Sequence, residues 1–255
     1  RFWPGPLTII LPVKPGVFPA NVNNDQETVA FRMPNQHSAL RLIDLVGAPL
    51  VGPSANLSGK PSPTSVDHVM QDFDGVISGV VAGDTDQAQI GVESTVVRPM
   101  SDRLIILRPG AITQSMLKQV CPKVQEFSVA EQLAAPQLQS PGVKYRHYSP
   151  KQAVFLFESS EDLANLHAKL VAKGGRVGLL ADESIIQALG QQSPVVATYS
   201  LGQPNDADSA TRQLYAGLRA LEASDCDWIL AQAVLESEKY HAYMNRLNKA
   251  ATSML

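Results

Sequence analysis

The feature that most constrains the fold is a repeated strand-and-helix pattern in the C-terminal part of the chain. Four short apolar segments are typical of buried strands, and each precedes a stretch with helical spacing. The expected strands cover 153–157, 176–180, 195–199 and 228–232, and the expected helices cover 161–172, 183–189, 207–221 and 240–254. Strands joined by helices run in one direction, so the pattern predicts a parallel, Rossmann-like sheet. No GxGxxG motif opens its first helix, which argues against a bound dinucleotide.

The N-terminal part alternates strands and helices less regularly. Expected strands cover 7–13, 28–32, 49–52, 76–81, 94–98 and 104–107, and expected helices cover 38–46, 64–73 and 113–120. This mixture of hairpins and crossovers predicts a twisted, mixed α/β sheet. Residues 123–152 lack periodicity and contain proline and glycine, which indicates a linker. We therefore expect domains at 1–122 and 153–255, joined by a linker or lid at 123–152.

Composition excludes several classes of protein. The 255 residues include only two cysteines, which form no CxxC pair. A disulfide framework or cysteine metal site is thus unexpected, and a reducing cytoplasm is the simplest compartment. The sequence contains no run of about 18 apolar residues, so we expect no membrane-spanning helix. The net charge of −3 argues against a broad nucleic-acid-binding surface, although it leaves a local basic patch open.

Residues 53–64 (PSANLSGKPSPT) form a polar, turn-rich segment between an expected strand and an expected helix. The hydroxyls of Ser54 and Ser62 are small donors, and N–H groups at a helix N-terminus carry partial positive charge. The segment is therefore suited to hold phosphate. Two plainer interpretations stay open: Thr64 or Ser65 is an ordinary helix cap, and Asn56 closes an Asx-turn.

Two arginines stand at the ends of expected strands. Arg32 can bind a carboxylate through two hydrogen bonds, although an ion pair at the rim of the sheet is the commoner role. Thr28 shares its strand face by the period-two rule. Arg108 can stabilise negative charge that develops during nucleotidyl transfer. The hydroxyls of Ser94 and Thr95 can bind a small polar substrate or simply face solvent.

Residues 144–148 (KYRHY) place cations and aromatic rings together in the expected linker. Such a run can stack on a nucleobase and neutralise phosphate, and on a linker it can close over a pocket as a lid. The alternative is that its aromatic rings anchor the linker to the surface. The other histidines are not spaced as metal ligands, and no Ser-His-Asp or Cys-His set is evident. We therefore expect no protein-bound metal and no covalent nucleophile.

Five segments in order resemble those of the threonylcarbamoyl-AMP synthase family, the YrdC-like proteins, and the resemblance covers essentially the whole chain. They are Phe2–Thr8, Val29–Pro34, Pro53–Thr64, Gly91–Gly110 and Ser140–Pro150. The last segment and everything after it resemble the two-domain branch. The resemblance implies a mixed-sheet YrdC-like domain followed by a Rossmann-like domain. Family members begin with a further segment that carries part of the active site, so we expect this chain to be truncated, its catalytic domain incomplete and its own activity in question.

The resemblance also implies roles for individual residues. Those that match threonine-binding positions are Arg32, Gly52 and Ser94. Those that match or are assigned to ATP binding are Thr28, Ser54, Ser62, Arg108, Tyr145 and His147, with Arg32 and Arg108 as the catalytic pair. Gly52 departs from the alanine or threonine that is usual there, which weakens that one contact.

The implied activity is synthesis of threonylcarbamoyl-AMP and pyrophosphate from L-threonine, bicarbonate and ATP, with Mg²⁺ accompanying ATP. The product serves a downstream tRNA-modifying threonylcarbamoyl transferase complex. Contact of this chain with RNA is left as an alternative, and no membrane partner is expected. Two alternatives remain. One is a non-catalytic RNA-binding module, against which the acidic net charge argues. The other is a carbamoyltransferase of related fold, which cysteine clusters would favour and this chain lacks.

Overall fold

The computed structural model divides the chain into two compact units, which are described separately. The described residues are 1–23, 26–83, 88–134, 149–189 and 195–252. The first unit comprises residues 1–53 and 93–145, and the second comprises 54–92 and 146–255. The expected domain boundaries at 122 and 153 remain a prediction.

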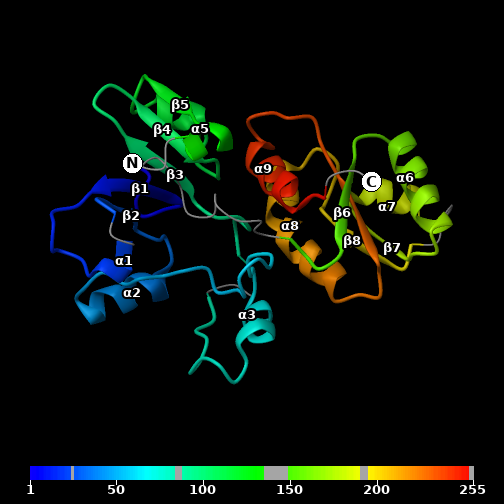
Figure 1. Ribbon diagram of the computed structural model, residues 1–255, viewed down its shortest axis with the longest axis horizontal. Coiled ribbons are helices and arrows are strands. Elements are labelled where there is room, and N and C mark those ends of the chain that lie inside the picture. Colours follow the sequence, from blue (N-terminus) through cyan, green and yellow to red (C-terminus); the bar gives the residue numbers. More distant parts are fainter. Residues whose placement is uncertain (24–25, 84–87, 135–148, 190–194, 253–255) are drawn as a thin grey trace. The chain divides into compact units, whose positions relative to one another are not determined.

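The first unit is built on a five-stranded mixed sheet of order β2-β1-β3-β4-β5 (Figure 1). Its strands are β1 (Leu7–Pro12), β2 (Thr28–Arg32), β3 (Thr95–Pro99), β4 (Leu104–Arg108) and β5 (Val124–Glu126). The β1–β2 and β3–β4 pairs are antiparallel, whereas β1–β3 and β4–β5 are parallel. The unit also contains α1 (Ala20–Asn23), α2 (His37–Val46), α4 (Gln114–Lys118) and α5 (Val129–Ala134).

Apolar side chains cover both faces of this sheet because strand residues alternate between faces. Leu7, Val97 and Ile106 pack in one cluster with Leu117 of α4, and Ile10 and Val96 pack in the other. The second face therefore also carries Thr8, which alternates with Leu7 on β1. This assignment of faces decides which polar side chains meet at the candidate site.

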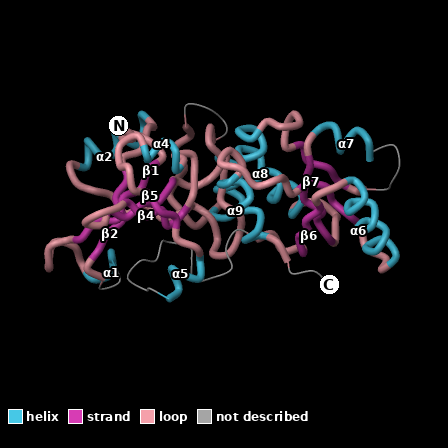
Figure 2. The backbone as a smooth tube through the Cα atoms, turned by 90° about the horizontal axis from the view of Figure 1, so that it is seen from above, coloured by secondary structure: helices cyan, strands magenta, loops and turns pink. Residues whose placement is uncertain are grey.

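The second unit holds the predicted parallel sheet, of order β6-β9-β7-β8. Its strands are β6 (Ala153–Phe157), β7 (Val177–Ala181), β8 (Ala197–Ser200) and β9 (Trp228–Gln232). Its helices are α3 (Val66–Phe73), α6 (Ser160–Ala172), α7 (Glu183–Leu189), α8 (Ala207–Glu222) and α9 (His241–Ala250). Helices α8 and α9 pack on one face and α6 and α7 on the other, as Figure 2 shows. The mixed sheet and the parallel sheet together confirm the predicted fold class.

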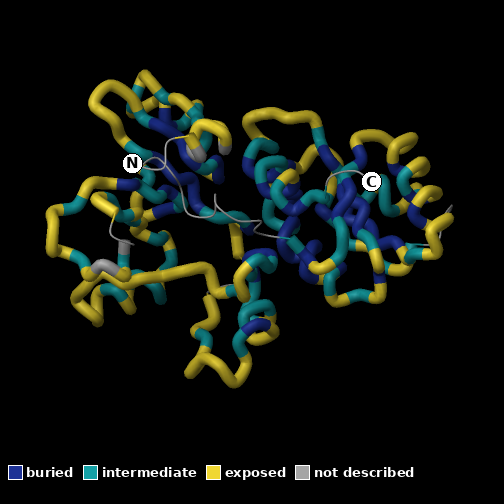
Figure 3. Tube along the Cα trace, in the orientation of Figure 1, coloured by how far each residue is buried: buried dark blue, intermediate teal, exposed yellow. Residues whose placement is uncertain are grey.

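Two expected strands are absent from the described residues. Leu50 and Val51 are 45% and 73% exposed, and Val76 and Val81 are 74% and 81% exposed. Residues 49–52 and 76–81 form irregular segments, which are exposed in Figure 3. The prediction was wrong because a short apolar run becomes a strand only where a neighbour satisfies its backbone hydrogen bonds. Conversely, β5 and α5 lie in the stretch expected to be a linker.

No helix in the described part of the chain is both long enough and apolar enough to cross a bilayer. The longest helix, α8, instead buries one stripe of apolar residues, including Leu214 and Leu218, against the parallel sheet. The spacing of apolar residues over 207–221 predicted this helix.

We predict that Leu214→Ala lowers the free energy of unfolding by about 2–5 kcal/mol, because it leaves a cavity in the core of the second unit. Leu214 is 0% exposed, whereas Leu235 in the same unit is 92% exposed. The matched control Leu235→Ala should change stability by less than about 0.5 kcal/mol. Urea denaturation followed by circular dichroism measures both. Equal losses for the two variants would contradict this packing.

Candidate functional site

A row of polar side chains crosses one face of the sheet in the first unit. Arg32 on β2 pairs directly with Thr8 on β1 in the antiparallel register, so their side chains share a face. The Thr8 Oγ1 and Ser94 Oγ atoms lie 2.6 Å apart in a hydrogen bond. Ser94 directly precedes β3, and Val96, two residues later, lies on the same face as Ile10. The row therefore runs from β2 across β1 to the start of β3.

Arg108 joins this row through an irregularity in the β3–β4 ladder. Val97 pairs with Ile106, but Val96 pairs with Arg108, so Leu107 is an extra residue in the register. A bulge of this kind re-aims the side chains that follow it. The Arg108 Nε atom donates to the Ser94 carbonyl oxygen at 3.1 Å, and Nη2 donates to Ser94 Oγ at 3.4 Å. The guanidinium is thereby held against Ser94.

A close backbone approach supports this arrangement. A Cβ atom on Gly110 would lie 2.6 Å from the Thr95 backbone nitrogen and 2.9 Å from the Glu93 carbonyl oxygen. Only glycine permits this approach, which keeps the end of β4 beside Ser94. Thr95 itself faces the other way: its Oγ1 donates to the Ile112 carbonyl at 2.8 Å and accepts from the Ile112 N–H. Thr95 therefore serves the core, not a substrate.

The Arg32 side chain makes no hydrogen bond or ion pair within the described residues, and the residue is exposed. The alternative interpretation, an ion pair at the rim, has no partner in that part of the chain. Three steps between neighbouring strands, roughly 14 Å in total, separate β2 from β4. Two arginines thus stand on either side of a pair of hydroxyls along this face of the sheet.

Three other residues expected to bind substrate also lie in the first unit. Thr28 begins β2, opposite Pro12 and on the same face as Arg32, four residues away. Gly52 lies in an exposed irregular segment, where a Cβ would have no neighbour within 4 Å. Ser94 is only 4% exposed, and its hydroxyl already makes hydrogen bonds with Thr8 and Arg108.

The segment 54–64 lies in the second unit, where Ser54 is exposed and Ser62 is 8% exposed. The Asn56 side-chain amide donates to the Leu57 and Lys60 carbonyls at 2.8 and 3.2 Å, so Asn56 shapes this loop. Ser65 is the N-cap of α3 and accepts from the His68 N–H, as one plainer interpretation predicted. The helix start is thus capped by its own sequence.

His68 also binds back to this segment. Its Nδ1 atom lies 3.2 Å from the Thr64 backbone nitrogen, which donates to it. Burial lowers the pKa of His68, and the positive charge of Arg219 lowers it further. A neutral imidazole is the form that accepts this hydrogen bond. The contact therefore depends on His68 remaining uncharged.

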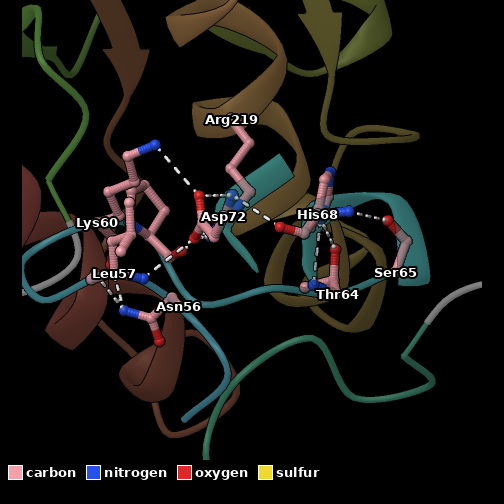
Figure 4. A network of polar contacts seen from close by, with 9 residues as sticks. Asn56, Leu57, Lys60, Thr64, Ser65, His68, Asp72 and Arg219 are labelled. Atoms are coloured by element: carbon pink, nitrogen blue, oxygen red, sulfur yellow. Dashed lines mark hydrogen bonds and ion pairs between the residues drawn. The ribbon is translucent and has the colours of Figure 1, made fainter. Parts of the chain in front are cut away.

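A buried charge cluster lies beneath the loop (Figure 4). The Arg219 Nη2 atom of α8 lies 2.7 Å from Asp72 Oδ2 of α3, and the two side chains are 3% and 0% exposed. Lys60 Nζ lies 3.1 Å from Asp72 Oδ1, and the Leu57 N–H donates to Oδ2 at 3.2 Å. Desolvation, the largest single influence, raises the Asp72 pKa. The combined hydrogen bonds from Arg219, Lys60 and Leu57 outweigh it and lower the pKa to about 2.

Several site residues were missed or fall elsewhere. The sequence motifs did not indicate Thr8, which the β1–β2 register places opposite Arg32. Asp72 and Arg219 gave no sequence signal, because they are 147 positions apart. Tyr145 and His147 lie outside the described residues. Among the residues that are described, no three His, Cys, Asp or Glu side chains gather as a metal site.

We predict that Asp72 makes folding stability depend on pH in acid. Its pKa is lower in the folded state than its ordinary 3.8, so the unfolded chain binds more protons between pH 3.8 and about 2. The stabilisation, on the order of 2 kcal/mol, is complete above pH 3.8 and is lost as pH falls through about 2. Urea titrations from pH 2 to 6 should show this slope reduced in Asp72→Asn. Asp74→Asn, at an exposed neighbouring position, should keep it. An unchanged slope in Asp72→Asn would contradict the assignment.

Comparison with family models and with known proteins finds relatives over nearly the whole chain. Residues 1–110 match a family model described as telomere recombination (Sua5/YciO/YrdC). Residues 112–252 match the threonylcarbamoyl-AMP synthase C-terminal domain. The threonylcarbamoyl-AMP synthase of Bacillus subtilis is 40% identical, over 98% of this chain and 71% of that protein. The Pyrococcus abyssi synthase is 36% identical, over 98% of this chain and 72% of its own length.

A solved structure is similar throughout. The crystal structure of P. abyssi Sua5 complexed with L-threonine superposes with a TM-score of 0.85 at 36% sequence identity. The match covers 98% of this chain and 72% of that one. Two matching family models, relatives named alike and a shared fold lead to one conclusion: the chain belongs to the threonylcarbamoyl-AMP synthase family.

Proposed function

We propose that this chain makes threonylcarbamoyl-AMP and pyrophosphate from L-threonine, bicarbonate and ATP. The observation that carries the proposal is the row of Arg32, Thr8, Ser94 and Arg108 on one sheet face. One arginine held against the hydroxyls and a second with its donors available suit a reaction between an amino acid and a nucleotide phosphate. Membership of the synthase family supports the same reaction.

Arg32 binds the carboxylate of L-threonine in this proposal. Its guanidinium is exposed and has the planar donor geometry that matches a carboxylate. Ser94 and Gly52 complete the threonine site in this proposal, with Thr8 orienting the Ser94 hydroxyl through their 2.6 Å hydrogen bond. The P. abyssi protein was solved with L-threonine, which supports an amino-acid site in a relative of the same fold.

The chemistry proceeds in two steps that balance. The threonine ammonium and bicarbonate give a carbamate, one water and one proton. A carbamate oxygen then attacks the α-phosphorus of ATP, the bond from that phosphorus to the bridging oxygen breaks, and pyrophosphate leaves. Arg108 stabilises the negative charge that develops at the phosphate, so catalysis is positioning and electrostatics without a covalent nucleophile.

ATP is bound by Thr28, Ser54, Ser62 and Arg108 in this proposal, with Tyr145 and His147 as further contacts. Mg²⁺ arrives as part of the nucleotide substrate, where it neutralises charge on the departing pyrophosphate. We further propose a cytoplasmic setting, in which the product passes to a tRNA-modifying threonylcarbamoyl transferase complex. Any contact with RNA would then be local, because the net charge of the chain is −3.

Product formation tests the proposal. The purified protein is incubated with ATP, Mg²⁺, L-threonine and labelled bicarbonate, and the products are separated by chromatography. We expect labelled threonylcarbamoyl-AMP that depends on L-threonine, together with stoichiometric pyrophosphate. A folded protein that binds neither L-threonine nor ATP, and forms no product, would contradict the proposed function.

We predict that Arg32→Ala weakens L-threonine binding by about tenfold to a hundredfold, because it removes the bidentate partner of the carboxylate. Calorimetric titration with L-threonine measures the change. Arg41 offers a matched control: it is an arginine of the same unit in an exposed ion pair with Asp44, with side chains 59% and 71% exposed. Arg41→Ala should bind L-threonine like the parent chain. Equal affinities for parent and Arg32→Ala would exclude Arg32 from the site.

A further inference from the structure

The segment 54–92, which includes the loop with Ser54 and Ser62, is held by the C-terminal part of the chain. The family models place this segment and helix α8 in different domains, because the first ends at residue 110 and the second begins at residue 112. Both nevertheless belong to one compact unit of the structure. The contacts that join them centre on Arg219 of α8 (Figure 4).

The Arg219 guanidinium makes contacts on three sides. Its Nε donates to the Pro61 carbonyl at 3.0 Å, and Nη2 donates to Asp72 Oδ2 at 2.7 Å. Nη1 donates to the His68 carbonyl and to Asp72 Oδ1, both at 3.4 Å. The N–H donors of a guanidinium lie in one rigid plane. They can therefore bond to several acceptors at once only when each acceptor holds a fixed position. Arg219 therefore fixes the loop at Pro61 and the helix α3 at Asp72 together.

Further contacts anchor the same segment independently. The Ser149 N–H donates to the Gly59 carbonyl at 3.1 Å. A Cβ on Gly91, whose φ is +79°, would lie 2.3 Å from the Arg212 Cα atom, so only glycine allows this approach to α8. Val92 packs against the core cluster that includes α8. The segment 54–92 is thus attached to α8 at Pro61, near the start of the segment, and at Gly91 and Val92, at the end of the segment.

We propose that Arg219 is a positioning residue for ATP binding, which acts from the C-terminal domain by fixing Pro61 and thereby the adjacent Ser62. The inference rests on the proposed function, in which the loop with Ser54 and Ser62 binds ATP. Arg219 itself touches no substrate in this scheme. A small displacement of Ser62 weakens a contact to phosphate strongly, because hydrogen bonds are short and directional. The C-terminal domain thereby takes part in the reaction.

The test compares ATP with L-threonine binding in two variants of the full chain. Calorimetric titrations with Mg²⁺-ATP and with L-threonine are run on the parent chain, Arg219→Met and Arg219→Lys. We expect the Kd for ATP to rise about tenfold in Arg219→Met, with the Kd for L-threonine within about twofold. The Kd of Arg219→Lys for ATP should lie between those of the parent chain and Arg219→Met, because an ammonium group can pair with Asp72 without also holding Pro61.

Arg176 provides the matched control. It forms an ion pair with Asp227 at 3.3 Å in the same unit, but the side chains are 53% and 44% exposed. Arg176→Met should leave both dissociation constants unchanged. Where product is measured, the KM for ATP should rise in the Arg219 variants, whereas the KM for L-threonine should stay nearly unchanged.

The outcomes separate the two proposals. A folded parent chain that does not bind ATP would overturn the proposed function, and with it this inference. A parent chain that binds ATP, with Arg219 variants that bind it equally well, would overturn the positioning role alone. Parallel loss of ATP and L-threonine binding would also overturn it, because that indicates general unfolding. If circular dichroism shows that Arg219→Met does not fold, the result for Arg219→Lys decides.

Discussion

The buried ion pair between Arg219 and Asp72 fixes helix α8, helix α3 and the loop at residues 57–61 to one another. Removing a guanidinium and a carboxylate from water costs several kcal/mol for each ion, and one good contact rarely offsets it. Here the carboxylate also accepts from Lys60 and from the Leu57 N–H, and the guanidinium also donates to the Pro61 carbonyl. Three of these partners lie in one loop. The charges can therefore stay buried only when that loop holds its observed conformation.

The first unit meets a different requirement, which is to place two arginines on one face of the sheet, three strand positions apart. Hydrogen bonds to Ser94 fix one of them. The register irregularity at Val96 turns Arg108 toward Ser94, and Gly110 allows the backbone to come close enough. Arg32, in contrast, remains exposed. One arginine is thus held in place, and the other keeps its donors available for a substrate.

The parallel sheet could be predicted well, because local signals determine it. The strands Ala153–Phe157 and Trp228–Gln232 agree with their predicted bounds, and buried apolar runs separated by amphipathic helices have few other solutions. The expected strand at 49–52 failed because apolar composition does not supply a hydrogen-bonding neighbour. The position of Thr8 beside Arg32 followed from period-two alternation once the strands were paired. The turn of Arg108 depends on a bulge, which no short motif indicates.

The charge cluster could not be predicted from the sequence, for a reason that also bears on function. Asp72 and Arg219 carry no local pattern, since 147 positions of the sequence separate the two partners. A contact of this kind couples the two parts. If ATP binds the loop best when Pro61 is held by Arg219, then by linkage bound ATP stabilises the Arg219 contact by the same factor. Helix α8 of the second domain then contributes to the free energy of ATP binding without touching the nucleotide.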